Sequence, residues 1–130
     1  MAKTKAPVIF ALFIAVALIW WFMPNSLTSI DPEEVSVIII FNGNTGNSTT
    51  IADSDDITYI IDSFNKTTIR KEKLSIGYMG YGYLLTIIKN DASIYHEFII
   101  NSANNIRKDP FFYQVTTNSI DYDYIQNLVD

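Results

Sequence analysis

The chain has 130 residues, of which 48% are hydrophobic and 14% aromatic, and its formal net charge is −5. This length allows one domain plus one targeting element, and the composition excludes a disordered chain. The sequence contains no cysteine, which excludes a disulfide framework, a thiol nucleophile, a thiolate metal site and a lipoprotein anchor. Beyond residue 5, seven basic residues stand against fourteen acidic ones. This balance predicts no binding to nucleic acid and repulsion of anionic lipid headgroups.

The first element in the chain is an apolar run over residues 6–23. It contains 18 residues and no charge, and as a helix it would span roughly 27 Å, about the thickness of the bilayer hydrocarbon core. Lys3 and Lys5 precede the run, whereas the next basic residue is Lys66. By the positive-inside rule, residues 1–5 lie in the cytoplasm and the domain lies outside the cell. The run therefore predicts a single transmembrane anchor in the lipid bilayer.

A cleaved signal peptide is the alternative to an uncleaved anchor. The charged start and the apolar centre of the segment fit both, but no A-x-A-like cleavage site follows. Ser29, with Leu27 two residues before it, is the best candidate and matches the pattern poorly. We therefore favour an anchor. Within it, Ala11 and Ala15 have the small-xxx-small spacing that pairs membrane helices, which predicts weak self-association.

The rest of the chain divides into a short polar stalk at residues 24–33 and an extracytoplasmic domain at residues 34–130. The domain opens with the β-branched run VSVIIIF at 35–41, which predicts a strand buried on both faces. Asparagine and glycine at 42–48 favour a turn, after which a short strand at 49–52 returns antiparallel to the first.

The clearest helix of the domain runs from Asp53 to Asn65. Its apolar residues have the spacing i, i+3, i+4, i+7 and form one stripe, which consists of Ile57, Ile60, Ile61 and Phe64. Asp53 is the expected N-cap, and Asp55 and Asp56 suit the first turn because the helix dipole favours carboxylates there. The charged segment that follows, residues 67–73, predicts an exposed or edge strand.

A β-hairpin is predicted over residues 81–101, with a two-residue turn at 90–91. This turn sets two cross-strand pairs, which are Leu85 with His96 and Ile87 with Ile94. The register is supported because it gathers an almost wholly apolar set on one face. That face consists of Tyr81, Tyr83, Leu85, Ile87, Ile94, His96, Phe98 and Ile100.

The remaining residues predict a loop at 104–110, a strand at 111–115 and a last helix at 119–129 capped by Asn118. The order β-β-α-β-β-β-β-α is typical of an α+β fold. We expect a largely antiparallel sheet with two short helices on one face, preceded by one transmembrane helix. The predicted core between sheet and helix consists of Ile60, Ile61, Phe64, Leu85, Ile87, Phe98 and Ile100.

His96 is the only histidine, so any serine–histidine–aspartate triad or histidine metal site has to include it. Its place on the apolar face favours a structural role. The alternative is a small secreted or anchored hydrolase in which carboxylates act with His96. The acidic residues 53–56 lack the spacing of an EF-hand, and helix capping accounts for them. The sequence predicts no catalytic, cofactor-binding or metal site. The interpretation that we favour is a protein that is not an enzyme.

The segment Gly77–Tyr83 combines three glycines with three tyrosines. Its glycines lack the dinucleotide-binding spacing, and a strand rather than a helix follows, so no phosphate site is predicted. One interpretation is a tight turn that leads into the strand, and the other is a contact surface for a partner protein. In the second interpretation, Tyr78, Met79 and Tyr81 are the expected contact residues.

The segments DSDDITYIIDSFN, YGYLLTI and PFFYQV, followed by a terminal helix, resemble small, uncharacterised extracytoplasmic domains that stand behind membrane anchors in low-GC Gram-positive bacteria. The resemblance covers residues 35–128 and carries no catalytic or binding residue to transfer. It implies an envelope localisation and an interaction or sensory role. We therefore expect a membrane-anchored interaction or sensor domain, or an accessory subunit of an envelope complex, whose partner is another membrane or envelope protein.

Overall fold

The computed structural model describes residues 5–78 and 82–129. An N-terminal helix, α1 (Lys5–Phe22), leads into a domain in which one sheet of eight strands packs against two helices, α2 (Ser54–Lys66) and α3 (Tyr122–Val129). Buried side chains of both helices join the same core cluster as one face of the sheet. The predicted α+β class is confirmed.

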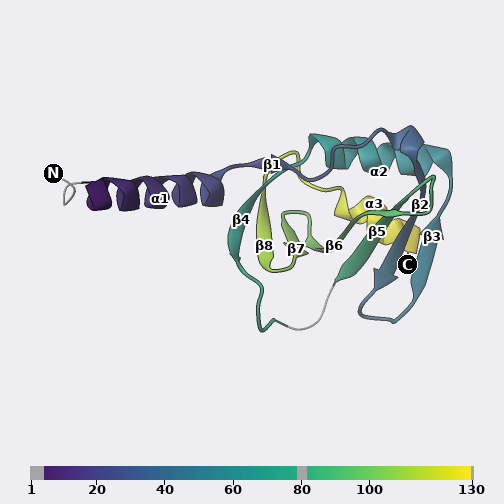
Figure 1. Cartoon of the computed structure of the whole chain (residues 1–130). Helices are drawn as coiled ribbons and strands as arrows, with labels where there is room; N and C mark the ends of the chain where they lie inside the picture. Colours follow the sequence, from purple (N-terminus) through teal and green to yellow (C-terminus); the bar gives the residue numbers. More distant parts are fainter. Residues whose placement is uncertain (1–4, 79–81, 130) are drawn as a thin grey trace.

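All strand pairs of the sheet are antiparallel, in the order β1-β4-β8-β7-β6-β5-β2-β3. The strands are β1 Asn25–Ser26, β2 Val35–Asn42, β3 Ser48–Ile51, β4 Thr68–Leu74, β5 Tyr83–Lys89, β6 Ile94–Ser102, β7 Asn105–Lys108 and β8 Phe111–Thr117, with a 3-10 turn, η2, at Pro32–Glu34. In Figure 1, α1 projects from the side of the domain that carries β4 and β8.

Two strands are missing from the sequence-based prediction. The expected loop at 104–110 is wrong, because β7 lies there and pairs with β6 on one side and β8 on the other. The second missing strand, β1, lies in the expected stalk and pairs with β4. β4 is therefore next to the edge of the sheet, and β1, which has only two residues, is the edge strand.

The core forms where alternating side chains of the sheet meet α2 and α3. The seven predicted core residues are each at most 2% exposed, which confirms that prediction. The rings of Phe64 in α2 and Phe98 in β6 meet edge to face, with centroids 5.6 Å apart. Asp53 caps α2 as expected, because its Oδ1 accepts hydrogen bonds from the main-chain N–H groups of Asp55 and Asp56 at 2.9 and 3.1 Å.

The expected burial of residues 35–41 on both faces is wrong. Ile38 and Ile40 of β2 are fully buried, whereas Val37, Ile39 and Phe41 are half-buried. The difference arises because the buried cluster, with its two helices, covers only one face of the sheet.

The β5–β6 hairpin has a register that differs from the prediction by two residues. Leu85 pairs with Phe98, and Ile87 pairs with His96. Because side chains alternate between the two faces of a strand, a shift of two residues leaves each side chain on its predicted face. The predicted pairs are wrong, but the apolar face is largely retained.

The cause lies at the end of the hairpin. Its loop is longer than the two residues expected: the N–H of Lys89 donates to the carbonyl of Ser93 at 2.9 Å, and Ala92 adopts a φ of +68°. A bulge between Ile87 and Ile88 of β5 adds one residue to β6. Ile94 is consequently 61% exposed, which corrects its predicted place on the apolar face.

The segment expected as a stalk packs onto the domain. Leu27 and Ile30 belong to the core, at 6% and 8% exposed. Asn65 of α2 fixes them in place, because its Oδ1 accepts from the Thr28 hydroxyl at 2.6 Å and from the Ile30 N–H at 3.3 Å, and its Nδ2 donates to the Ile30 carbonyl at 2.7 Å. Only two residues, 23 and 24, therefore separate α1 from β1.

The last helix, α3, begins at Tyr122 instead of residue 119. Asn118, the predicted cap, adopts a φ of +57° and donates through Nδ2 to the carbonyl of Ser63. Asp121 has the capping role, because its Oδ1 accepts from the main-chain N–H of Tyr124 at 3.1 Å.

The N-terminal helix α1 is long and apolar enough to cross a membrane, although a signal sequence satisfies the same criterion. None of its side chains is buried, and its apolar residues surround the whole helix.

Candidate functional site

A row of side chains crosses the face of the sheet opposite α2 and α3. The pairings that form it join six strands, from β2 to β4. Its members, in spatial order, are Phe41, Leu84, Ile99, Arg107, Phe112 and Lys73. Four of the six are apolar, and all lie outside the core cluster that the structure describes.

Further apolar residues lie beside this row. Val37 pairs with Ile88, and Ile39 lies between Phe41 and Val37 on the same face of β2. We call the whole apolar set the helix-free face, and it consists of Val37, Ile39, Phe41, Leu84, Ile88, Ile99 and Phe112. Polar residues stand next to it, among them Thr50, Thr86 and Gln114.

The composition of the helix-free face is unusual for the second side of an antiparallel sheet. Such a side is commonly polar, because water covers it. Here no described helix packs on it, yet its aliphatic side chains are β-branched or leucine. Five of its seven residues are half-buried, whereas Ile99 and Phe112 are only 8% exposed. A partly accessible apolar patch with a polar surround favours contact with another molecule.

Tyr78 extends the helix-free face at its β4 end. Its ring stands edge to face on Phe112, with centroids 5.0 Å apart, and its side chain is 50% exposed. The Lys73 ammonium lies 4.8 Å from the Tyr78 ring centroid and donates to the phenol oxygen at 3.3 Å. Of the other predicted contact residues, Met79 and Tyr81 lie outside the described residues.

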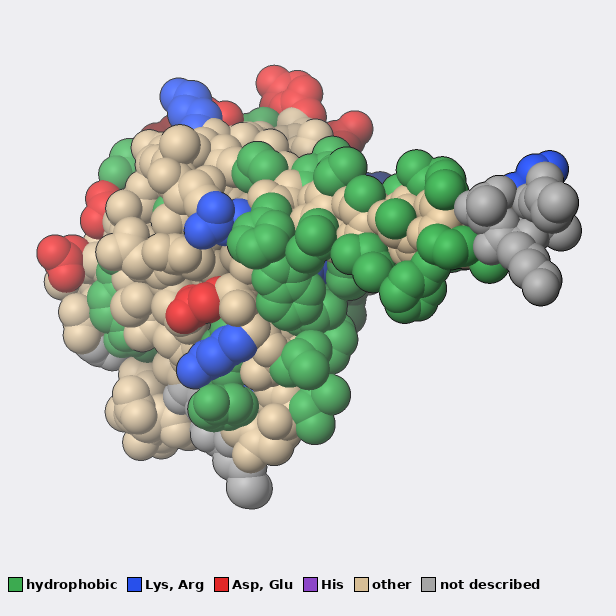
Figure 2. Space-filling view, turned by 90° about the vertical axis from the view of Figure 1, so that its left-hand side faces the viewer, with side chains coloured by type: hydrophobic (Ala, Val, Ile, Leu, Met, Phe, Trp, Pro, Cys, Tyr) green, Lys and Arg blue, Asp and Glu red, His purple; other side chains and the backbone are tan. Residues whose placement is uncertain are grey.

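The end of α1 contacts the domain through aromatic rings. Trp20 and Trp21 both meet Phe111 of β8 edge to face, at centroid distances of 5.9 and 5.6 Å. The Lys71 ammonium of β4 lies 4.1 Å from the Trp20 centroid, and the Arg70 guanidinium lies 5.9 Å from the Phe22 centroid. Figure 2 shows hydrophobic side chains gathered where the helix joins the domain, with basic side chains beside them.

His96 is half-buried at the edge of the core, beside Lys108 of β7. The Lys108 ammonium lies 3.2 Å from Nδ1 of the imidazole. Burial and the positive charge of Lys108 lower the pKa of His96 below its usual 6.5, which favours the neutral imidazole. Among the described residues, no carboxylate forms a hydrogen bond or ion pair with His96. The geometry therefore lends no support to a hydrolase that uses carboxylates with this histidine.

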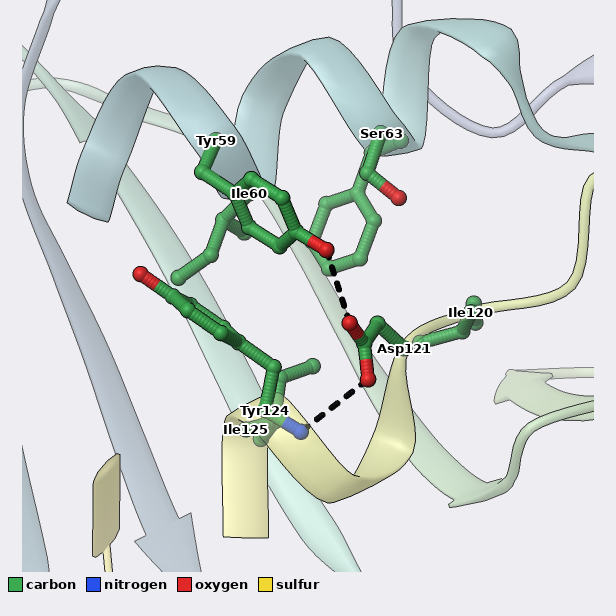
Figure 3. Close-up of a pocket in the computed structure, with 8 residues that line it drawn as sticks. Tyr59, Ile60, Ser63, Ile120, Asp121, Tyr124 and Ile125 are labelled. Atoms are coloured by element: carbon green, nitrogen blue, oxygen red, sulfur yellow. Dashed lines mark hydrogen bonds between the residues drawn. The ribbon is translucent and has the colours of Figure 1, made fainter. Parts of the chain in front are cut away.

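The contact between α2 and α3 leaves a partly open pocket of about 10 Å³, which holds one water at most. The Tyr59 hydroxyl donates to Asp121 at 2.7 Å, and Figure 3 shows both side chains pointing toward one another across the two elements. The Tyr124 hydroxyl donates to Asp56, and this bond is the main cause that raises the pKa of Tyr124 to about 12. These bonds join the helices, and the space left is too small for an organic ligand.

The acidic residues near the start of α2 are occupied by structural roles. Asp53 caps the helix, and Asp56 accepts from Tyr124. Within residues 5–78 and 82–129, no group of three or more histidine, aspartate or glutamate side chains is placed to hold a metal ion. Over the same residues, every buried side-chain nitrogen or oxygen has a hydrogen-bond partner.

No protein-family model, curated protein or solved structure matches this chain. The helix-free face and α1 are therefore the features from which a function can be inferred.

The sequence interpretation missed the helix-free face. The signal was present in the run at 35–41, where every second residue faces away from the core but remains apolar. On its own, that pattern predicts a strand covered on both sides. An antiparallel strand whose second apolar face is uncovered has the same sequence pattern. The run cannot distinguish the two cases, because any element that covers the strand lies elsewhere in the chain.

Proposed function

We propose that this protein is a single-pass membrane protein with its N-terminus in the cytoplasm, and that its extracytoplasmic domain binds another membrane or envelope protein through the helix-free face. In this role it acts as an interaction or sensor domain, or as an accessory subunit of an envelope complex. The observation that carries the proposal is the apolar row across a sheet face that no described helix covers.

The anchor part of the proposal rests on α1 and on the packing of residues 25–30 against the domain. The helix is apolar on every side and ends in two tryptophans, which favour the headgroup layer. Cleavage after Ser29 would remove β1 and take Leu27 and Thr28 out of the buried part of the domain. An uncleaved anchor keeps these contacts, and Lys3 and Lys5 favour a cytoplasmic N-terminus.

The interaction part rests on the chemistry of the helix-free face. Protein interfaces combine an apolar centre with a polar rim, and aromatic residues are enriched in them. Phe41 and Phe112 belong to the face, and Tyr78 extends it. A tether of only two residues between α1 and β1 keeps the domain close to the bilayer, which raises its effective concentration for other membrane proteins.

Crosslinking in the native membrane tests the partner. A photoreactive amino acid at Ile39, which is half-buried on the helix-free face, should capture a specific protein that mass spectrometry can identify. The matched control carries the same group at Gln126, an exposed residue of α3. Equal capture from both positions, or none from Ile39, would contradict binding through this face.

Protease treatment of intact cells tests the anchor and its orientation. We expect the domain to be digested from outside while a fragment that contains residues 6–23 stays in the membrane. A domain protected in intact cells would contradict the orientation, and a mature N-terminus at Ile30 would contradict the anchor.

A further inference from the structure

Basic and acidic residues are segregated within the domain. The segments 68–74 and 105–117, which form β4, β7 and β8 with the turn between the last two, carry five basic and two acidic residues. The rest of the chain beyond residue 23 carries two basic and twelve acidic residues. The net charge of the domain therefore conceals a basic region on three neighbouring strands.

This basic region adjoins the end of α1. Phe111, which contacts both tryptophans of α1, pairs with Leu74 of β4 on one side and with Lys108 of β7 on the other. Lys71 of β4 contacts Trp20 directly. Because tryptophans at the end of a membrane helix favour the headgroup layer, these contacts place the basic strands at the same depth.

Exposed apolar side chains lie in the same place. Leu74 is 51% exposed and Ile76 is 74% exposed. The segment that carries them is fixed to the β7–β8 turn, because the Ser75 N–H donates to the Pro110 carbonyl at 2.8 Å and the Ser75 hydroxyl donates to Asp109 at 2.6 Å. In Figure 1, β4 and the segment after it run along the side of the domain from which α1 leaves.

We propose that this side of the domain binds anionic phospholipid headgroups and rests on the bilayer. The membrane-proximal surface that does so consists of Arg70, Lys73, Leu74, Ile76 and Lys108, whereas Lys71 is buried against Trp20. Its basic side chains attract headgroup phosphates, while Leu74 and Ile76 enter the apolar layer beneath them, in the manner of an interfacial anchor. The inference depends on the proposed membrane anchor, and it is independent of the proposed protein partner.

The proposal corrects the expectation drawn from net charge. Screening limits the reach of charge to about 10 Å at 0.1 M salt, so a headgroup senses the nearest residues and not the whole domain. The acidic residues at the start of α2 follow β3, which lies at the opposite edge of the sheet from β1 and β4. Local attraction and remote repulsion together favour one orientation of the domain on the bilayer.

Site-specific fluorescence on the full-length protein tests the contact. The chain has no native cysteine, so Ile76→Cys provides a single site for a polarity-sensitive dye, and Ile94→Cys, also highly exposed, provides the matched control at the far hairpin. Both variants are placed in nanodiscs that contain a lipid-borne quencher, with either phosphatidylglycerol or phosphatidylcholine. At position 76 we expect quenching several-fold stronger with phosphatidylglycerol than with phosphatidylcholine. At position 94 we expect weak quenching with either lipid.

Charge variants separate electrostatic binding from simple proximity to the anchor. Replacing Arg70, Lys73 and Lys108 by Gln should reduce the quenching at position 76 to the phosphatidylcholine value, and so should about 1 M salt, which shortens screening to about 3 Å. Replacing Lys66 and Lys89, the two basic residues of the domain outside segments 68–74 and 105–117, should leave the quenching at position 76 unchanged.

Equal quenching in the two lipids, or full quenching in the triple variant, overturns the proposal. So does shielding of position 76 in native membranes but not in nanodiscs, which would assign the surface to a protein. Failure of the chain to insert into nanodiscs would instead count against the anchor itself.

Discussion

The ammonium group of Lys71 lies 4.1 Å from the centroid of the Trp20 ring. Trp20 belongs to the end of α1, and Lys71 lies in the middle of β4, where its side chain is only 8% exposed. The contact therefore joins the N-terminal helix to the sheet over a gap of fifty residues in the sequence. Together with the packing of both tryptophans on Phe111, it restricts how the domain turns on its helix.

We predict that Trp20 and Lys71 are energetically coupled. In a double-mutant cycle with Trp20→Leu and Lys71→Gln, the coupling in the free energy of unfolding should be about 1–2 kcal/mol, because the cation lies over the ring with little water around it. The measurement is chemical denaturation of the full-length protein in nanodiscs. Leucine keeps α1 apolar, so insertion should be unaffected.

Trp21 provides the matched control for this cycle. Its ring contacts Phe111 but not the Lys71 ammonium, so the pair Trp21→Leu and Lys71→Gln should couple more weakly. Equal coupling for the two tryptophans would contradict a specific contact between Lys71 and Trp20, and it would show that Lys71 interacts with the aromatic cluster as a whole.

Asn65 should be important for the stability of the domain. Asn65→Ala removes three hydrogen bonds to Thr28 and Ile30, and at roughly 1 kcal/mol each the free energy of unfolding should fall by about 2–3 kcal/mol. The Ile30 amide should also exchange faster with solvent. Asn127→Ala, at an exposed position in α3, controls for the change in helix propensity and should stay within about 0.5 kcal/mol of the native protein.

The stability of the domain should depend on His96 in mildly acidic solution. The folded-state pKa of His96 lies below the usual 6.5, so below pH 6.5 the unfolded chain binds more protons than the folded one. The free energy of unfolding therefore falls as the pH drops through this interval. His96→Gln should lose less stability than the native protein between about pH 7.5 and about pH 5, as measured by thermal unfolding.

Lys108→Gln gives an independent check on the cause of this pH dependence. The charge of Lys108 is one of the two causes that lower the pKa of His96, and burial is the larger one. The variant should weaken the pH dependence without abolishing it.

Asp109 does not contribute to the pH dependence in this interval. Its pKa is lowered because Ser75 and Arg107 donate to it, so its contribution to stability is lost only at lower pH, below about 3.8. If the stability of His96→Gln depended on pH in the same way as that of the native protein, His96 would not be the cause of the dependence.

Local sequence signals were sufficient for the helix α2 and for the core. The spacing from Ile57 to Phe64 and the cap at Asp53 describe one helix completely, and neither depends on distant residues. The apolar face of the hairpin survived an error of two residues in register, because alternation has a period of two.

Features set by tertiary contacts could not be predicted in this way. β7 is short and polar, and pairing with β6 and β8 is what makes it a strand. Residues 27–30 have the sequence of a polar stalk, and they belong to the domain only because Asn65, far along the chain, forms hydrogen bonds with Thr28 and Ile30. The basic region likewise exists only because the sheet order places β4, β8 and β7 side by side.

Leu84→Asp should separate binding from folding. Leu84 stands in the row between Phe41 and Ile99, and it is half-buried on the helix-free face. A carboxylate there remains accessible to water in the isolated protein, so stability should fall far less than after Phe64→Ala, which should cost about 3–5 kcal/mol. In a complex the same carboxylate would lose its water and find an apolar surface opposite.

The affinity for the protein captured at Ile39 should therefore fall at least about 30-fold in Leu84→Asp, which corresponds to the loss of about 2 kcal/mol expected at the centre of an interface. Ile94→Asp introduces the same charge at an exposed apolar residue of the hairpin end and should bind normally. Titration calorimetry with the purified partner measures both. If the two variants bind equally well, the partner does not cover the helix-free face.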